Sequence, residues 1–180
     1  MRNSLLGCAY CCHSKIKHTL LAISVVALIW PNAAGQAAED LLPALSLPTL
    51  NGQKLGSSAL KNNIVVLDFW ATWCEPCIAE IPDFNNLQDR YAARGVKVIG
   101  VAAQSGWARD IQKFTAKYDV RYTILAGNDD TVTDFGVINF PTTFLISPGW
   151  KIYKKYSGSY ERKSAEIERD IEALLNQHDR

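Results

Sequence analysis

Cys74 and Cys77 stand two residues apart directly after an apolar run, and this pair is the strongest chemical signal in the sequence. If a helix begins at Cys74, then Cys77 lies one turn further on, close enough for the two sulfurs to form a disulfide. The unpaired N–H groups and the dipole of a helix N-terminus favour a thiolate and should lower the pKa of Cys74 from about 8.5. Cys74 is therefore expected to attack a disulfide, and the more buried Cys77 to release the mixed disulfide that results.

Other uses of the cysteine pair have less support. A structural zinc site needs four ligands, but beyond residue 38 the chain has no other cysteine and one histidine, His178. Haem attachment requires a histidine after the second cysteine, where Ile78 stands. We therefore expect no metal and no cofactor. An inert structural disulfide would close a loop too small to stabilise much, so a peroxide-reducing cysteine is the more serious competitor.

Length and composition limit the function classes further. The 180 residues suffice for one globular domain, and with 48% hydrophobic residues and a net charge of +1 the chain is not expected to be disordered. The same charge balance argues against a nucleic-acid partner. Two of the three histidines, His13 and His18, fall near the start of the chain, which leaves little material for catalysis by a Cys–His or Ser–His pair.

Residues 1–38 have the organisation of an export signal. They contain three basic residues and no acidic one, then an apolar run over residues 19–30, then small residues. This pattern predicts a cleaved secretory signal or a retained N-terminal membrane anchor, with one domain over residues 39–180 on the extracytoplasmic (periplasmic) side of the membrane. Three further cysteines, Cys8, Cys11 and Cys12, precede the apolar run and are interpreted as part of a cytoplasmic stub.

Apolar periodicity predicts the elements that position the cysteine pair. The continuous run IVVLDFW at residues 64–70 indicates a buried strand, and the three- and four-residue spacing that follows indicates a helix over residues 77–91. An Asn51-Gly52 pair predicts a hairpin turn before them. The order is that of an α/β layer with a parallel part and an antiparallel end. Further strands are expected at 96–103, 122–125, 142–146 and 151–156, and further helices at 107–118, 129–135 and 167–175.

The segment LDFWATWCEPC resembles the active-site strand and turn of the thioredoxin superfamily, and Phe140-Pro141-Thr142 is similar to its cis-proline segment. The hairpin, the export leader and an additional helix and strand before Pro141 resemble the TlpA/ResA branch of membrane-associated thiol–disulfide oxidoreductases. The resemblance implies a thioredoxin-like α/β fold with an N-terminal β-hairpin and a central helix–strand insertion.

The resemblance also implies roles for individual residues. Cys74 matches the nucleophile and Cys77 the resolving thiol of a redox-active disulfide. Pro141 matches the cis-proline beside which an extended substrate lies. The residues expected to contact substrate are Trp73, Pro76, Phe140 and Pro141.

Two carboxylates are candidates for moving the proton of Cys77. Asp68 matches the buried acid of ordinary thioredoxins, where ResA-like proteins more usually have a neutral residue, and Glu80 matches the ResA-like glutamate near the dithiol. From position alone, Asp68 could instead face solvent at a strand edge, and Glu80 could be ordinary helix surface.

These features predict an extracytoplasmic thiol–disulfide oxidoreductase that acts mainly as a reductant on protein disulfides. Glu75-Pro76 between the cysteines is similar to ResA, which reduces apocytochromes c, but other members of the branch reduce different exported proteins, so the substrate stays open. The family also implies a membrane carrier of thiol electrons as the reducing partner. Two alternatives stay open. One is a thiol peroxidase, although Leu67 stands where such an enzyme has a proline seven residues before its cysteine. The other is a binding or chaperone module with an inert disulfide.

Overall fold

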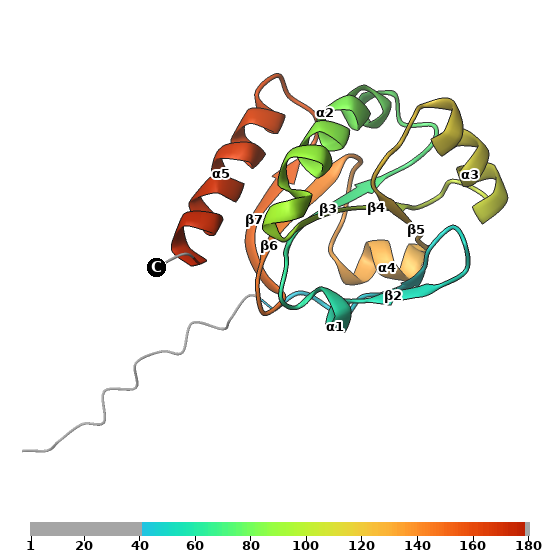
Figure 1. Ribbon diagram of the computed structural model, residues 1–180. Coiled ribbons are helices and arrows are strands. Elements are labelled where there is room, and N and C mark those ends of the chain that lie inside the picture. The colour runs from blue at the N-terminus through green and yellow to red at the C-terminus, as the bar shows by residue number, and fades with distance from the viewer. Residues whose placement is uncertain (1–40, 179–180) are drawn as a thin grey trace, which may run out of the picture. The chain divides into compact units, whose positions relative to one another are not determined.

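The computed structural model describes residues 41–178, so the predicted leader and its cysteines lie outside the described residues. A five-stranded sheet of order β5-β4-β3-β6-β7 forms the centre, and a separate two-stranded hairpin, β1-β2, packs beside it (Figure 1). The elements are β1 (Ser46–Pro48), β2 (Lys54–Gly56), α1 (Ser57–Leu60), β3 (Ile64–Trp70), α2 (Glu75–Tyr91), the 3-10 turn Ala92–Arg94, β4 (Val96–Ala102), α3 (Ala108–Lys117), β5 (Thr123–Ala126), α4 (Asp129–Asp134), β6 (Thr142–Ser147), β7 (Lys151–Ser157) and α5 (Lys163–His178).

Strand directions divide the sheet into two parts. β3, β4 and β5 are parallel, while β6 and β7 are antiparallel to their neighbours. The parallel strands are joined through α2 and α3, as parallel connections require. The predicted thioredoxin-like α/β architecture is therefore confirmed, and β5 is the inserted strand that forms one edge of the sheet.

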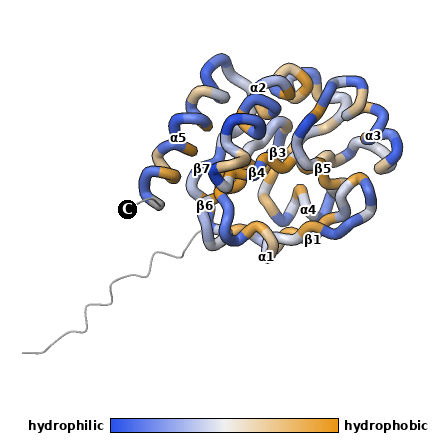
Figure 2. Tube along the Cα trace, in the orientation of Figure 1, coloured by the Kyte–Doolittle hydropathy of each residue, from blue (hydrophilic) through white to orange (hydrophobic). Residues whose placement is uncertain are grey.

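The central strand β3 is buried along its whole length, so its two faces contribute to two separate cores. Val66 and Trp70 pack under α2, α3 and α5, whereas Leu67 and Phe69 face the hairpin, α1 and α4. Figure 2 shows the most hydrophobic segments gathered in these inner strands. By alternation, Asp68 lies on the same face as Val66 and Trp70, beneath the helix that follows the cysteines.

The predicted hairpin turn is present, with Gly52 at a positive φ of 85°. The hairpin is joined to the sheet by a bridge between Thr49 and Leu125 of β5. Gly95, at φ 83°, ends the 3-10 turn that follows α2.

Two sequence-based expectations differ from the structure. The helix expected from residue 107 begins at Ala108, and Trp107, which we expected to contribute to its apolar face, is the N-cap with a side chain that is 81% exposed. The four-residue helix α1 was not predicted, since it is too short to show periodicity. Within residues 41–178 no helix is both long enough and apolar enough to cross a membrane.

Candidate active site

Cys74 and Cys77 form a disulfide where β3 passes into α2. Cys74 is the N-cap of α2, and its Sγ accepts a hydrogen bond from the backbone N–H of Cys77 at 3.3 Å. A thiolate at Cys74 would retain this donor and gain from the dipole of a 17-residue helix. Pro76 lies in the first turn of α2, where a backbone N–H would have no acceptor within the helix, so the missing N–H of proline costs no hydrogen bond. Both cysteines are buried in this oxidised form, so exposure does not separate them here.

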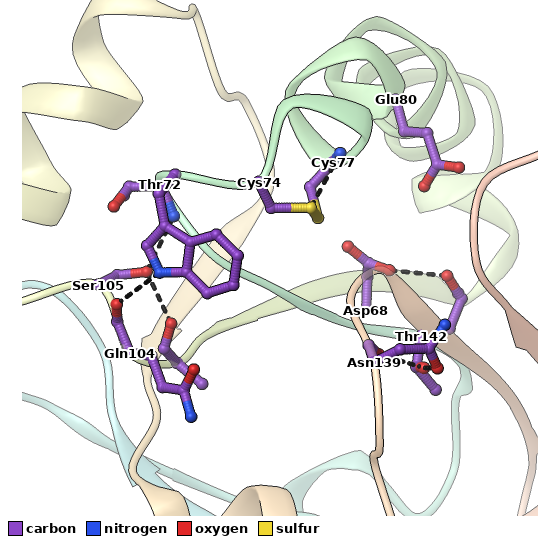
Figure 3. Close-up of a disulfide and its surroundings, with 12 residues drawn as sticks. Asp68, Thr72, Cys74, Cys77, Glu80, Gln104, Ser105, Asn139 and Thr142 are labelled. Carbon is purple, nitrogen blue, oxygen red and sulfur yellow. Dashed lines mark hydrogen bonds between the residues drawn. A yellow bond between two sulfur atoms is a disulfide. The ribbon is translucent and has the colours of Figure 1, made fainter.

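Asp68 is buried within β3 and points toward the helix that carries the disulfide (Figure 3). The hydroxyl of Thr143, its register partner on β6, donates a hydrogen bond of 2.7 Å to Asp68 Oδ1. Burial raises the pKa of Asp68 from 3.8 to about 7, although the positive charge of Lys163 and the Thr143 bond act in the opposite direction. Asp68 can therefore gain or lose a proton near neutral pH.

Glu80 is also buried, on the inward face of α2 (Figure 3). Its Oε2 accepts a hydrogen bond of 2.8 Å from Nζ of Lys163, the first residue of α5, and the two form a buried ion pair. Its Oε1 has no hydrogen-bond partner in the described structure. The interpretations of Asp68 and Glu80 as solvent-facing residues are therefore wrong, because both are buried.

An apolar surface lies beside the disulfide. The Phe140–Pro141 peptide bond is cis, and the ring of Phe140 lies 5.9 Å from that of Trp73, measured between centroids. Trp73 is 63% exposed and is held by a bond of 2.9 Å from its Nε1 to the carbonyl of Gln104. Ile138, 94% exposed, borders the same hollow of about 220 Å³.

The structure thus brings together the residues that the sequence singled out. Asp68, Glu80 and the disulfide lie near one end of β3 (Figure 3). Trp73 is exposed and Phe140 half-buried on the adjacent surface, whereas Pro141 is buried beneath it. Sequence reasoning missed Lys163, Thr143 and Ile138. Lys163 could have been found, because it precedes Ile167 and Ile171 at four-residue steps and so belongs to the buried face of α5.

Comparisons of the sequence with known proteins identify relatives that are thiol–disulfide oxidoreductases or thioredoxin-like proteins. The AhpC/TSA family model matches residues 38–155. Thioredoxin-like protein YneN of Bacillus subtilis is 31% identical over 139 residues, which cover 77% of this chain and 79% of that one. Thiol-disulfide oxidoreductase ResA of Bacillus thuringiensis is 30% identical over 125 residues, covering 69% and 72%.

A solved structure is similar as well. The protein described as thiol:disulfide interchange protein DsbE from Chlorobium tepidum has a TM-score of 0.70 and 31% identity, over 76% of this chain and 96% of that one. Because the family match and these relatives extend over most of the domain, the chain belongs to the AhpC/TSA family, as a ResA-like thiol–disulfide oxidoreductase with a thioredoxin-like fold.

Proposed function

We propose that this protein reduces disulfides of exported proteins, with Cys74 as the nucleophile and Cys77 as the resolving thiol. The observation that carries the proposal is the Cys74–Cys77 disulfide at the N-cap of α2, where a backbone N–H already donates to Cys74 Sγ. That donor favours a thiolate at Cys74 rather than at Cys77, which lies within the first turn and further from the helix end.

The reaction consists of two exchanges. In the first, the Cys74 thiolate attacks a substrate disulfide, one substrate sulfur leaves as a thiolate, and a mixed disulfide joins Cys74 to the substrate. In the second, Cys77 gives its proton to the Asp68 carboxylate and attacks Cys74 Sγ, so that the second substrate sulfur leaves. Two electrons pass from the cysteine pair to the substrate. A membrane carrier of thiol electrons would then reduce the Cys74–Cys77 disulfide.

The surface beside the disulfide supports a polypeptide as substrate. Trp73, which precedes Cys74 in the chain, and Ile138 expose apolar side chains and line one hollow with Phe140, whose peptide bond to Pro141 is cis. An unfolded segment could lie extended along this edge and make backbone hydrogen bonds there. We therefore assign Trp73, Pro76, Phe140 and Pro141 to substrate contact and add Ile138 to them.

The buried carboxylate of Asp68 supports the reducing direction. A thiolate close to an ionised Asp68 is repelled by it, which destabilises the reduced dithiol and lowers the reduction potential of the pair. The charge of Glu80 is balanced by Lys163, so it adds little to this repulsion. The similarity of Glu75-Pro76 to ResA further suggests apocytochromes c as targets.

Trapping of partners tests the proposed targets. A Cys77→Ser protein expressed in its host is expected to accumulate as mixed disulfides through Cys74, because the resolving thiol is absent. Mass spectrometry of the captured proteins should identify exported proteins with cysteine pairs, including apocytochromes c. A Cys74→Ser/Cys77→Ser protein is the control and should capture none. If the captured proteins were cytoplasmic, or if both variants captured the same ones, the proposed targets would be wrong.

The proposed extracytoplasmic location rests on the leader at residues 1–38 and is tested separately. A reporter that is fluorescent only after folding in the cytoplasm, fused after Arg180, is expected to stay dark when expressed with the full chain. The same fusion lacking residues 1–38 should be bright. Fluorescence from the full-length fusion would contradict export.

A further inference from the structure

Lys163 is an unusual residue for the position that it occupies. Its side chain is only 3% exposed, although lysine is rarely buried without a compensating charge. It opens α5 and reaches across to α2, where its Nζ lies 2.8 Å from Glu80 Oε2. Burial of such a pair is costly, and hydrophobic residues could fill the same space at no such cost. The cost suggests that the charges are retained for a purpose other than stability.

Asp68 and Glu80 lie on facing elements beside the disulfide (Figure 3), and the charges of Glu80 and Lys163 act on Asp68 in opposite directions. From α2 it faces Glu80 and Cys77, and from α5 it faces Lys163. The Tyr122 hydroxyl, just before β5, is kept neutral because burial and both carboxylates raise its pKa. Thr143 on β6 contributes an uncharged hydroxyl, and the opposite position on β4 is a glycine, Gly100.

We propose that Lys163 is a positioning residue, which binds Glu80 directly and thereby leaves Asp68 as the carboxyl that exchanges a proton with Cys77. The inference rests on the proposed role of Asp68. With Glu80 ionised against Lys163, the cluster is neutral when Asp68 is protonated and carries one negative charge when it is not. Because Lys163 acts on the carboxylates of both Glu80 and Asp68, replacing either Lys163 or Glu80 should change the affinity of Asp68 for its proton.

The two replacements should act in opposite directions. Glu80→Gln leaves the charge of Lys163 uncompensated, so Asp68 should lose its proton at a pH lower by at least about one unit. Lys163→Met removes the attracting charge, so Asp68 should keep its proton to a higher pH. A merely structural loss would admit water in both variants, and hydration lowers the titration midpoint of a buried carboxyl in each case. Opposite shifts therefore distinguish electrostatic positioning from loosened packing.

The titration can be followed directly in the oxidised protein by NMR of ¹³C-carboxyl-labelled aspartate, where neither cysteine titrates. The Asp68 signal is identified by its absence from an Asp68→Asn protein. Lys154→Met is the matched control, since Lys154 also lies 2.8 Å from a carboxylate, that of Asp170, but does not face Asp68. Its Asp68 midpoint should equal that of the unchanged protein.

If Lys163→Met fails to fold, the double variant Lys163→Met/Glu80→Gln replaces the ion pair by neutral groups and should give an Asp68 midpoint above that of Glu80→Gln alone. Shifts in the same direction for both single variants, or none, would overturn the role of Lys163. Exchange rates with a model disulfide, measured on the same proteins, test the role of Asp68 separately. The Asp68 midpoint could shift as expected in both variants while the pH dependence of the exchange rate stays unchanged. That result would contradict proton transfer by Asp68 but not the electrostatic control of Asp68 by Lys163.

Discussion

A Cys74→Ser protein is expected to lose disulfide exchange completely, to the rate measured in buffer alone. Cys74 occupies the N-cap of α2, and its Sγ accepts a hydrogen bond from the backbone N–H of Cys77. A serine hydroxyl at this position can still cap the helix, so the domain should fold, but it supplies no thiolate. Turnover of a small protein disulfide in the presence of excess dithiol, followed by the appearance of substrate thiols, measures the loss.

Cys77→Ser provides the matched comparison. This variant keeps the nucleophile and should react once with an equimolar amount of substrate before it stalls as a mixed disulfide. If the Cys77→Ser protein turned over normally, while the Cys74→Ser protein was alkylated quickly at Cys77, the two cysteines would have the reverse roles.

Asp68→Asn is expected to slow exchange near pH 7 by about a hundredfold, the lower part of the range for loss of a general base. Burial raises the pKa of Asp68 to about 7, so in the unchanged protein the carboxylate fraction rises between about pH 6 and pH 8. The exchange rate should rise over the same interval. The variant lacks this rise, and its profile should follow the titration of the cysteines alone. Stopped-flow exchange between pH 5 and 9 gives both profiles.

The control for this variant is Asp83→Asn, which makes the same change on the exposed side of α2. It should leave both the rate and its pH dependence unchanged. An Asp68→Asn protein with the rate and profile of the unchanged protein would mean that Asp68 is structural and that another group accepts the proton.

The same substitution should also change stability with a defined sign. Because the pKa of Asp68 is raised from 3.8 in the unfolded chain to about 7 in the folded one, the folded state binds more protons between these values. Stability therefore falls as pH rises from about 4 to 7, by up to about 4 kcal/mol from this group. Asp68→Asn removes this loss, and its amide oxygen can still accept the Thr143 hydroxyl. Denaturant unfolding should show the variant gaining most above pH 7 and least below pH 4.

The sequence predicts most of the fold because its signals are strongly periodic. The short run at β3 (Ile64–Trp70), rich in β-branched residues, is typical of a buried strand. The Asn51-Gly52 pair indicates the hairpin, and short apolar runs and helical spacing indicate β4, β6, β7 and the long helices. The helix was expected to begin at residue 107 because Trp107 lies four residues before the buried Ile111, but Trp107 precedes the first turn of α3 and helical spacing no longer applies to it. The position of a helix end depends on the cap, which the apolar pattern does not contain.

The candidate site was only partly accessible from sequence. The cysteines and Pro141 belong to a compact motif, but the environment of Asp68 depends on residues 75 and 95 positions further along the chain, Thr143 and Lys163. These contacts arise from the pairing of β6 with β3 and from the packing of α5 against α2. The spacing of residues within one element predicts neither the strand pairing nor the helix packing. The exposure of Ile138 could not be predicted from its type, because hydrophobic residues are more often buried.

The central claim is that the Cys74–Cys77 pair carries two electrons to protein disulfides. The most direct test mixes the fully reduced protein with a protein disulfide under anaerobic conditions and counts both products. We expect one Cys74–Cys77 disulfide to form for each substrate disulfide reduced, and only slow oxidation of the cysteine pair when hydrogen peroxide replaces the substrate. Rapid consumption of peroxide without reduction of protein disulfides would contradict the account and make this protein a peroxidase.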